Sequence, residues 1–77
     1  MNRNDAVLVM EDILANFEGE WLNSFAISNS QDPCAKGYKL RIKGPLNASS
    51  IRKINEISEA YHLCIREDDG LVIYEQS

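Results

Sequence analysis

Apolar residues recur at three- and four-residue steps near the start of the chain, which is the spacing of an amphipathic helix. The pattern predicts a helix over residues 5–17, with Asn2 or Asn4 as its N-terminal cap and Gly19 beyond its C-terminal end. The stripe expected to face the core consists of Val7, Met10, Ile13 or Leu14, and Phe17. Such a stripe needs an apolar surface to cover it.

A second helical pattern starts at Asn47, the expected cap, and runs to about His62. Arg52 and Glu56 lie four residues apart on its polar side, where they would face solvent. Its expected buried stripe consists of Ile51, Ile54, Ile57 or Ser58, and Tyr61.

Alternation of apolar and polar residues predicts a strand over residues 21–28. Trp21, Phe25 and Ile27 occupy odd positions in this segment, and Asn23 interrupts the pattern. Residues 29–37 contain a proline and a glycine and are expected to form a turn-rich connection.

The next strand is expected over residues 38–43, and Gly44-Pro45 would end it. The alternation here has no interruption, so the two sides of the strand differ sharply in character. Tyr38, Leu40 and Ile42 point to one side, and Lys39, Arg41 and Lys43 point to the other.

Residues 63–75 are typical of a β-hairpin whose turn is Asp68-Asp69-Gly70. A three-residue loop with a left-handed Gly70 puts an apolar set on one face, and it leaves Cys64, Arg66, Val72 and Tyr74 outward. That apolar set consists of Leu63, Ile65, Leu71 and Ile73. A two-residue Asp69-Gly70 turn would instead pair Ile65 with Tyr74. We favour the three-residue loop because its apolar face is cleaner.

The expected order is therefore α-β-β-α-β-β, in a single α+β domain that spans residues 1–77. An antiparallel four-stranded sheet with both helices packed on one face hides one stripe per helix and one face per strand. The opposite sheet face is then expected to be solvated.

The chain has 77 residues, of which 44% are hydrophobic, so a deep active site would compete with the core for the same few apolar side chains. This argues against an enzyme. No segment approaches the ~20 apolar residues that cross a membrane, and residues 1–5 lack the features of a secretion signal. We therefore expect a cytoplasmic protein that does not enter a membrane.

The residue types that carry catalysis or metal binding are sparse. Cys34 and Cys64 are far apart in the sequence, and Cys64 is expected to be a buried, inert thiol. His62 would share a face with Cys64 if the strand began at His62, but no third residue is evident to orient such a pair. The four glycines are isolated, so they form no phosphate-binding loop. We expect no catalytic residues, no metal and no cofactor.

Charge is unevenly distributed along the chain. The segment from residue 36 to residue 53 contains no acidic residue, whereas the net charge of the whole chain is −4. The segment's cations are Lys36, Lys39, Arg41, Lys43, Arg52 and Lys53. The molecule is therefore expected to be electrically two-sided.

The basic strand face is the candidate site. We expect a non-enzymatic binding module, an adaptor, regulator or inhibitor, that docks a protein partner through this face. A nucleic-acid-binding module that uses the same face is the alternative, although the acidic remainder of the chain would repel phosphates. Solvated surface is the plainest interpretation, and a homodimer through a sheet edge is a further possibility. The candidate partner-binding residues are Lys39, Arg41, Lys43, Arg52, Lys53, Arg66 and Tyr74.

Overall fold

The computed structural model describes residues 1–17, 25–29, 35–43 and 46–76. These residues form two helices and four strands in the predicted order, and the predicted α+β class is confirmed. The elements are α1 (Arg3–Phe17), β1 (Phe25–Asn29), β2 (Ala35–Lys43), α2 (Ala48–Ala60), β3 (Cys64–Glu67) and β4 (Gly70–Gln76). The predictions for Gly19, Trp21, Cys34 and Gly44-Pro45 fall outside the described residues.

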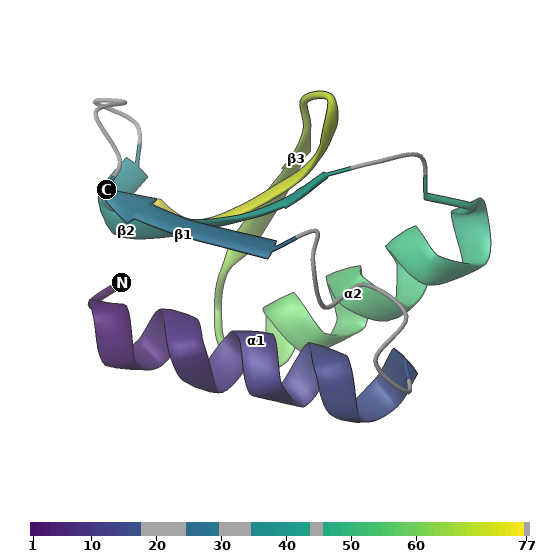
Figure 1. Cartoon of the computed structure of the whole chain (residues 1–77), viewed down its shortest axis with the longest axis horizontal. Coiled ribbons are helices and arrows are strands. Elements are labelled where there is room, and N and C mark those ends of the chain that lie inside the picture. The colour runs from purple at the N-terminus through teal and green to yellow at the C-terminus, as the bar shows by residue number, and fades with distance from the viewer. Residues whose placement is uncertain (18–24, 30–34, 44–45, 77) are drawn as a thin grey trace.

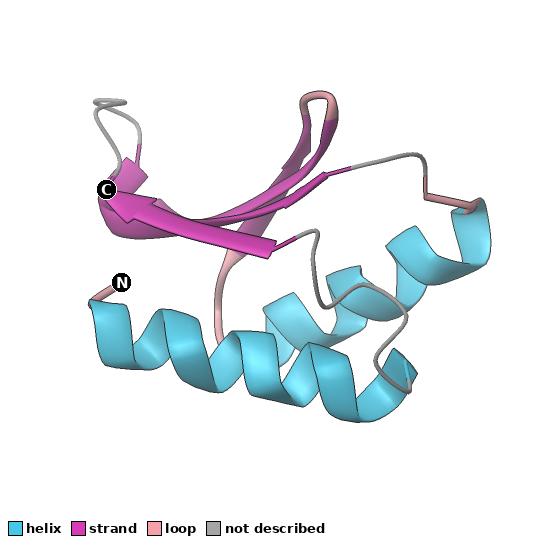
Figure 2. Ribbon diagram, viewed as in Figure 1, coloured by secondary structure: helices cyan, strands magenta, loops and turns pink. Residues whose placement is uncertain are grey.

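The four strands form one antiparallel sheet in the order β1-β2-β4-β3. Both helices lie on the same side of this sheet, as expected, and the core fills the space between the two layers (Figures 1 and 2). The largest fully buried side chains include Val9, Ile13, Leu40, Ile42, Ile54, Leu71 and Ile73. Burial of these side chains is the main force that holds the helical layer on the sheet.

Helix α1 begins two residues earlier than predicted, because the backbone N–H of Asp5 donates to Oδ1 of Asn2 at 2.8 Å. Its buried residues are Ala6, Val9 and Ile13, so the predicted stripe was partly wrong. The difference is a rotation about the helix axis. α1 contacts α2 as well as β1 and β2, so the face that it buries is set by all three neighbours.

Helix α2 has the predicted cap, since the N–H of Ser50 donates to Oδ1 of Asn47 at 2.8 Å. The helix ends at Ala60 rather than at His62. His62 takes a left-handed conformation with φ 59°, and its N–H donates to the Glu59 carbonyl at 3.0 Å. This closes the last helical turn, an arrangement that usually uses glycine.

The predicted buried stripe of α2 was correct for its middle and wrong at its end. Ile54 and Ser58 are fully buried, and Ile51 and Ile57 pack against the core. Tyr61 is 37% exposed, because it follows the helix end and its hydroxyl reaches Asp12 on α1 instead.

Strand β2 starts at Ala35, so the predicted connection over residues 29–37 was too long. The strand passes through an irregularity between Lys36 and Lys39, where Gly37 has φ 75°. A Cβ atom at Gly37 would overlap the Met1 carbonyl oxygen, and that oxygen accepts a hydrogen bond from the N–H of Tyr38 at 2.7 Å. Between the pairs Lys36–Glu75 and Lys39–Tyr74, β2 has two residues more than β4. The contact with Met1 accommodates these two residues.

The hairpin has the favoured register, with Ile65 opposite Ile73 and Glu67 opposite Leu71. Three residues, 68–70, separate the last pair, and both Asp69 and Gly70 have positive φ. The alternative pairing of Ile65 with Tyr74 is wrong. Ile65, Leu71 and Ile73 share the face that carries the core, as the pattern of apolar residues predicted.

Candidate functional site

The face of the sheet opposite the helices collects side chains from all four strands, and we call it the outer sheet face. The strand register aligns them in two rows across the sheet, since directly paired residues share a face. One row is Ala26, Arg41, Val72 and Arg66. The other row is Ser28, Lys39, Tyr74 and Cys64. Lys43, opposite Gly70, extends the same face.

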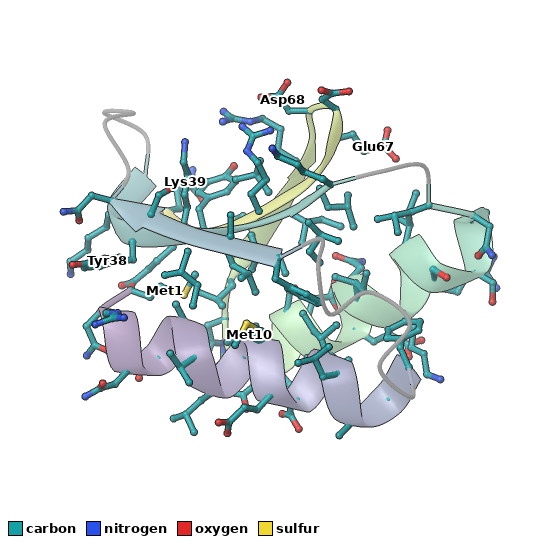
Figure 3. All side chains as sticks on the ribbon, in the orientation of Figure 1. Met1, Met10, Tyr38, Lys39, Glu67 and Asp68 are labelled. Atoms are coloured by element: carbon teal, nitrogen blue, oxygen red, sulfur yellow. The ribbon has the colours of Figure 1, made fainter. Side chains whose placement is uncertain are left out.

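Five of the seven candidate partner-binding residues therefore lie together on the outer sheet face. They are Lys39, Arg41, Lys43, Arg66 and Tyr74. In Figure 3, Lys39 projects away from the helices, whereas Met1 and Met10 lie between the sheet and α1. Sequence alternation alone placed the three β2 cations on one face, but Arg66 and Tyr74 join them only because β4 lies between β2 and β3.

Val72 corrects the expectation that this face is solvated throughout. It is only 1% exposed, although it lies on the outer sheet face. Arg41 and Arg66 occupy the strand positions directly on either side of it. The aliphatic stems of long basic side chains cover neighbouring apolar surface while their charged ends stay in water. The face thus has a buried apolar centre with cations around it.

Both arginines beside Val72 are held by defined contacts. The Arg66 guanidinium lies over the Tyr74 ring, with 5.6 Å between Cζ and the ring centroid. Arg41 donates to the Asp68 carbonyl at 3.1 Å, and it also forms an ion pair with the Asp68 carboxylate at 3.5 Å. Asp68 belongs to the hairpin turn, and its contact with Arg41 was not anticipated from sequence because the two residues are distant along the chain (Figure 3).

Arg52 and Lys53 lie on α2, in the layer on the other side of the sheet, so the structure does not bring them to the outer sheet face. The Lys53 ammonium donates to the Asn16 carbonyl at 3.2 Å and lies 5.1 Å from the centroid of the Phe17 ring. A cation at this position stabilises the C-terminal end of α1, because the last backbone carbonyls of a helix lack partners within the helix. This contact gives Lys53 a structural role.

His62 and Cys64 do not share one face of a strand, which was the arrangement that would have aligned a Cys-His pair. Strand β3 begins at Cys64, and the left-handed backbone of His62 lies before it. Cys64 lies on the outer sheet face, half-buried, where its thiol donates to Oε1 of Gln76 at 3.7 Å, so the expectation of a fully buried thiol was wrong. The cause is its register position opposite Tyr74.

His62 lines a hollow of about 260 Å³ beside the N-terminus, together with residues of α1 and β4. A second, more open hollow of about 480 Å³ shares Met1, Asp5 and Glu75 with the first. The Met1 ammonium forms an ion pair with Glu75 at 2.8 Å and also donates to the Lys36 carbonyl.

The Met1 ammonium is the main influence on the pKa of Glu75. Its hydrogen bond and its positive charge lower the pKa of the Glu75 carboxyl, and the more distant Lys36 adds to the effect. The two contacts of the Met1 ammonium join the N-terminus to β2 at the Lys36 carbonyl and to β4 at the Glu75 carboxylate.

No helix among the described residues has the length and apolar character needed to cross a membrane. The chain matches no protein-family model, no curated protein and no solved structure. Among the described residues, the outer sheet face is the candidate functional surface.

Proposed function

We propose that this protein is a non-enzymatic binding module, acting as an adaptor, regulator or inhibitor, that docks an acidic protein partner through the outer sheet face in the cytoplasm. The observation that carries the proposal is the arrangement of cations and Tyr74 around the buried Val72. Arginine and tyrosine contribute much of the binding energy at protein interfaces, and both residue types lie around Val72.

The contacts of Arg41 and Arg66 support this proposal. Arg41 is held by Asp68, and Arg66 is held by the Tyr74 ring, so both guanidinium groups are already oriented in the unbound molecule. Immobilising a flexible side chain on binding costs about 0.5–1.5 kcal/mol, and part of that cost is already met here. Carboxylates of a partner are the groups complementary to this cationic face, because hydrogen bonds between an ammonium or guanidinium group and a carboxylate are among the strong ones.

A nucleic acid is the less favoured ligand for this face. The Arg66 guanidinium already lies over the Tyr74 ring, which hinders base stacking on that side of the ring. Arg52 and Lys53, which would have enlarged the phosphate-binding surface, lie in the helical layer. The excess of acidic over basic residues in the whole chain also opposes phosphate binding.

The test compares two variants with the same change in charge. K39E/K43E reverses two cations of the outer sheet face and leaves the Arg41–Asp68 contact in place. R3E/R52E reverses two exposed cations of the helical layer and serves as the matched control. Each variant and the wild type are used as bait in native lysate, with and without nuclease, and the captured partner is then titrated against the purified baits.

The proposal expects a protein that survives nuclease treatment, that binds wild type and R3E/R52E equally, and that binds K39E/K43E at least tenfold more weakly. Recovery of nucleic acid that is lost only with K39E/K43E would replace the protein partner with the alternative ligand. Equal binding by all three baits, or no specific capture by any, would refute the proposal. The outer sheet face would then be ordinary solvated surface.

A further inference from the structure

The two edges of the sheet differ in how well they are protected. β3 is four residues long and ends in Arg66 and Glu67, whereas β1 is a five-residue strand with no charge and no proline. Proteins usually protect exposed edges with charges, proline, bulges or short length, because an open edge can pair with another strand. Within the described part of the chain, β1 pairs on one side only, with β2.

The flank of α1 beside this edge is also incompletely covered. With 3.6 residues per turn, Val7, Met10 and Leu14 lie on one flank of α1. The other flank faces α2 and the residue that follows it, since the Asn16 carbonyl accepts from Lys53 and the Asp12 carboxylate accepts from Tyr61. All three apolar residues are half-buried, but Met10 also packs against the core, so Val7 and Leu14 are the apolar residues of this flank that need further cover. Because α1 contacts β1 and β2 whereas α2 contacts β3 at the opposite edge, the flank of α1 away from α2 lies toward the β1 edge of the sheet.

We propose that a second copy of this chain covers both features by pairing its β1 with β1 in antiparallel fashion. A two-fold axis perpendicular to the sheet at Ile27 sets Ile27 opposite its own counterpart and Ala26 opposite Ser28 of the second copy. Phe25 then lies opposite Asn29 of the second copy. The result is a continuous eight-stranded sheet with all helices on one face.

The composition of β1 favours a second copy over an unrelated extended peptide. The strand is compatible with itself, because the axis brings small residues together on the outer side and Ile27 against itself on the inner side. No like charges meet across the axis, since β1 has no charged residue. A single added peptide strand would complete the sheet edge but would leave the half-buried flank of α1 uncovered. A second copy brings its own α1 to that flank.

The test places charges at the two exposed outer positions of β1. In A26E/S28E each new glutamate faces a cation of its own chain, Arg41 or Lys39, so the folded monomer is favoured. Across the axis the same glutamates face each other in two pairs, which opposes the dimer. A26E/S28K is the control, because its introduced glutamate and lysine form two opposite-charge pairs across the axis. Its introduced lysine faces Lys39 of its own chain, so the fold of this variant is checked before its mass is compared.

Sedimentation equilibrium over a concentration series measures the mass of each protein, and circular dichroism confirms its fold. The proposal expects a dimer for wild type and for A26E/S28K, and a dissociation constant at least tenfold higher for A26E/S28E. A monomeric wild type at every concentration would overturn it. A dimer that both variants weaken equally, or that neither weakens, would overturn the pairing at Ile27.

Hydrogen exchange of the wild type provides a second measurement that needs no variant. The alternate backbone amides of residues 25–29 that point away from β2 should become more protected as the protein concentration rises through the dimerisation range, because an added strand occupies their free hydrogen-bonding groups. Amides of β3, the other edge, should not change. Concentration-dependent protection confined to β3 would place the interface at the wrong edge and refute the proposal.

Discussion

Replacing Ser58 with alanine should stabilise this protein, which is the reverse of the usual effect of a core substitution. Ser58 is fully buried on the inner face of α2, and its hydroxyl has no hydrogen-bond partner among the residues that the structure describes. Its backbone carbonyl, by contrast, accepts the N–H groups of Leu63 at 2.9 Å and Tyr61 at 3.1 Å. The side-chain oxygen is therefore the unsatisfied group, and S58A removes it without disturbing the end of the helix.

The magnitude follows from two contributions. An unsatisfied buried hydroxyl costs about 1–3 kcal/mol, and alanine is a better helix former than serine by roughly 0.5 kcal/mol. The lost van der Waals contacts of one oxygen atom offset part of this gain. We expect the free energy of unfolding to rise by about 1–2 kcal/mol, which corresponds to roughly 4–16 °C in Tm for a domain of this size.

Urea denaturation followed by circular dichroism measures the effect, with S49A as the control on the same helix. Ser49 is exposed, so its substitution should change the free energy of unfolding by less than about 0.5 kcal/mol. A loss of stability in S58A, with S49A unchanged, would refute the reasoning. It would mean that the Ser58 hydroxyl has a partner in solution that stabilises the fold.

Three further substitutions test the local structure. H62G should stabilise the protein by about 0.5–1 kcal/mol in urea denaturation, because glycine relieves the left-handed strain at φ 59°; a loss of stability would contradict this. G37A should destabilise it by about 2 kcal/mol in the same assay, since a Cβ there meets the Met1 carbonyl at φ 75°, and an unchanged midpoint would be inconsistent with the contact. E75Q should be less stable than wild type at neutral pH. The ion pair with Met1 lowers the folded pKa of Glu75, so its stabilisation is present above the ordinary value of 4.5 and is lost as pH falls through the lowered pKa. Thermal denaturation from pH 7 to pH 2 should show the two proteins converge in acid, and a difference independent of pH would exclude the ion pair as its cause.

The candidate site was predictable in part. The alternation in residues 38–43 placed Lys39, Arg41 and Lys43 on one face, because a strand has a side-chain period of two. The hairpin turn and its apolar residues fixed Arg66 and Tyr74 on the outward side of the last two strands. Their approach to the β2 cations depends on the strand order, which no local pattern encodes.

The remaining features of the site depend on contacts between distant segments. The apolar centre at Val72 depends on neighbours from two other strands, and the orientation of Arg41 depends on Asp68 in the hairpin turn. Arg52 and Lys53 are close to the basic strand along the chain and yet lie in the other layer of the fold. Closeness along the chain therefore did not predict which cations lie on the outer sheet face.

The sequence by itself determined the elements, their order and the side on which each strand residue lies. These properties depend on backbone periodicity, on capping side chains such as Asn47 and on turn residues such as Gly70, all of which act over a few positions. Only the tertiary structure decided the rotation of α1, the start of β2 at its contact with Met1, and the burial of Val72 and Ser58. Burial depends on which surfaces meet, and a helix stripe that is apolar over a wide arc is compatible with several rotations until a second helix occupies one flank.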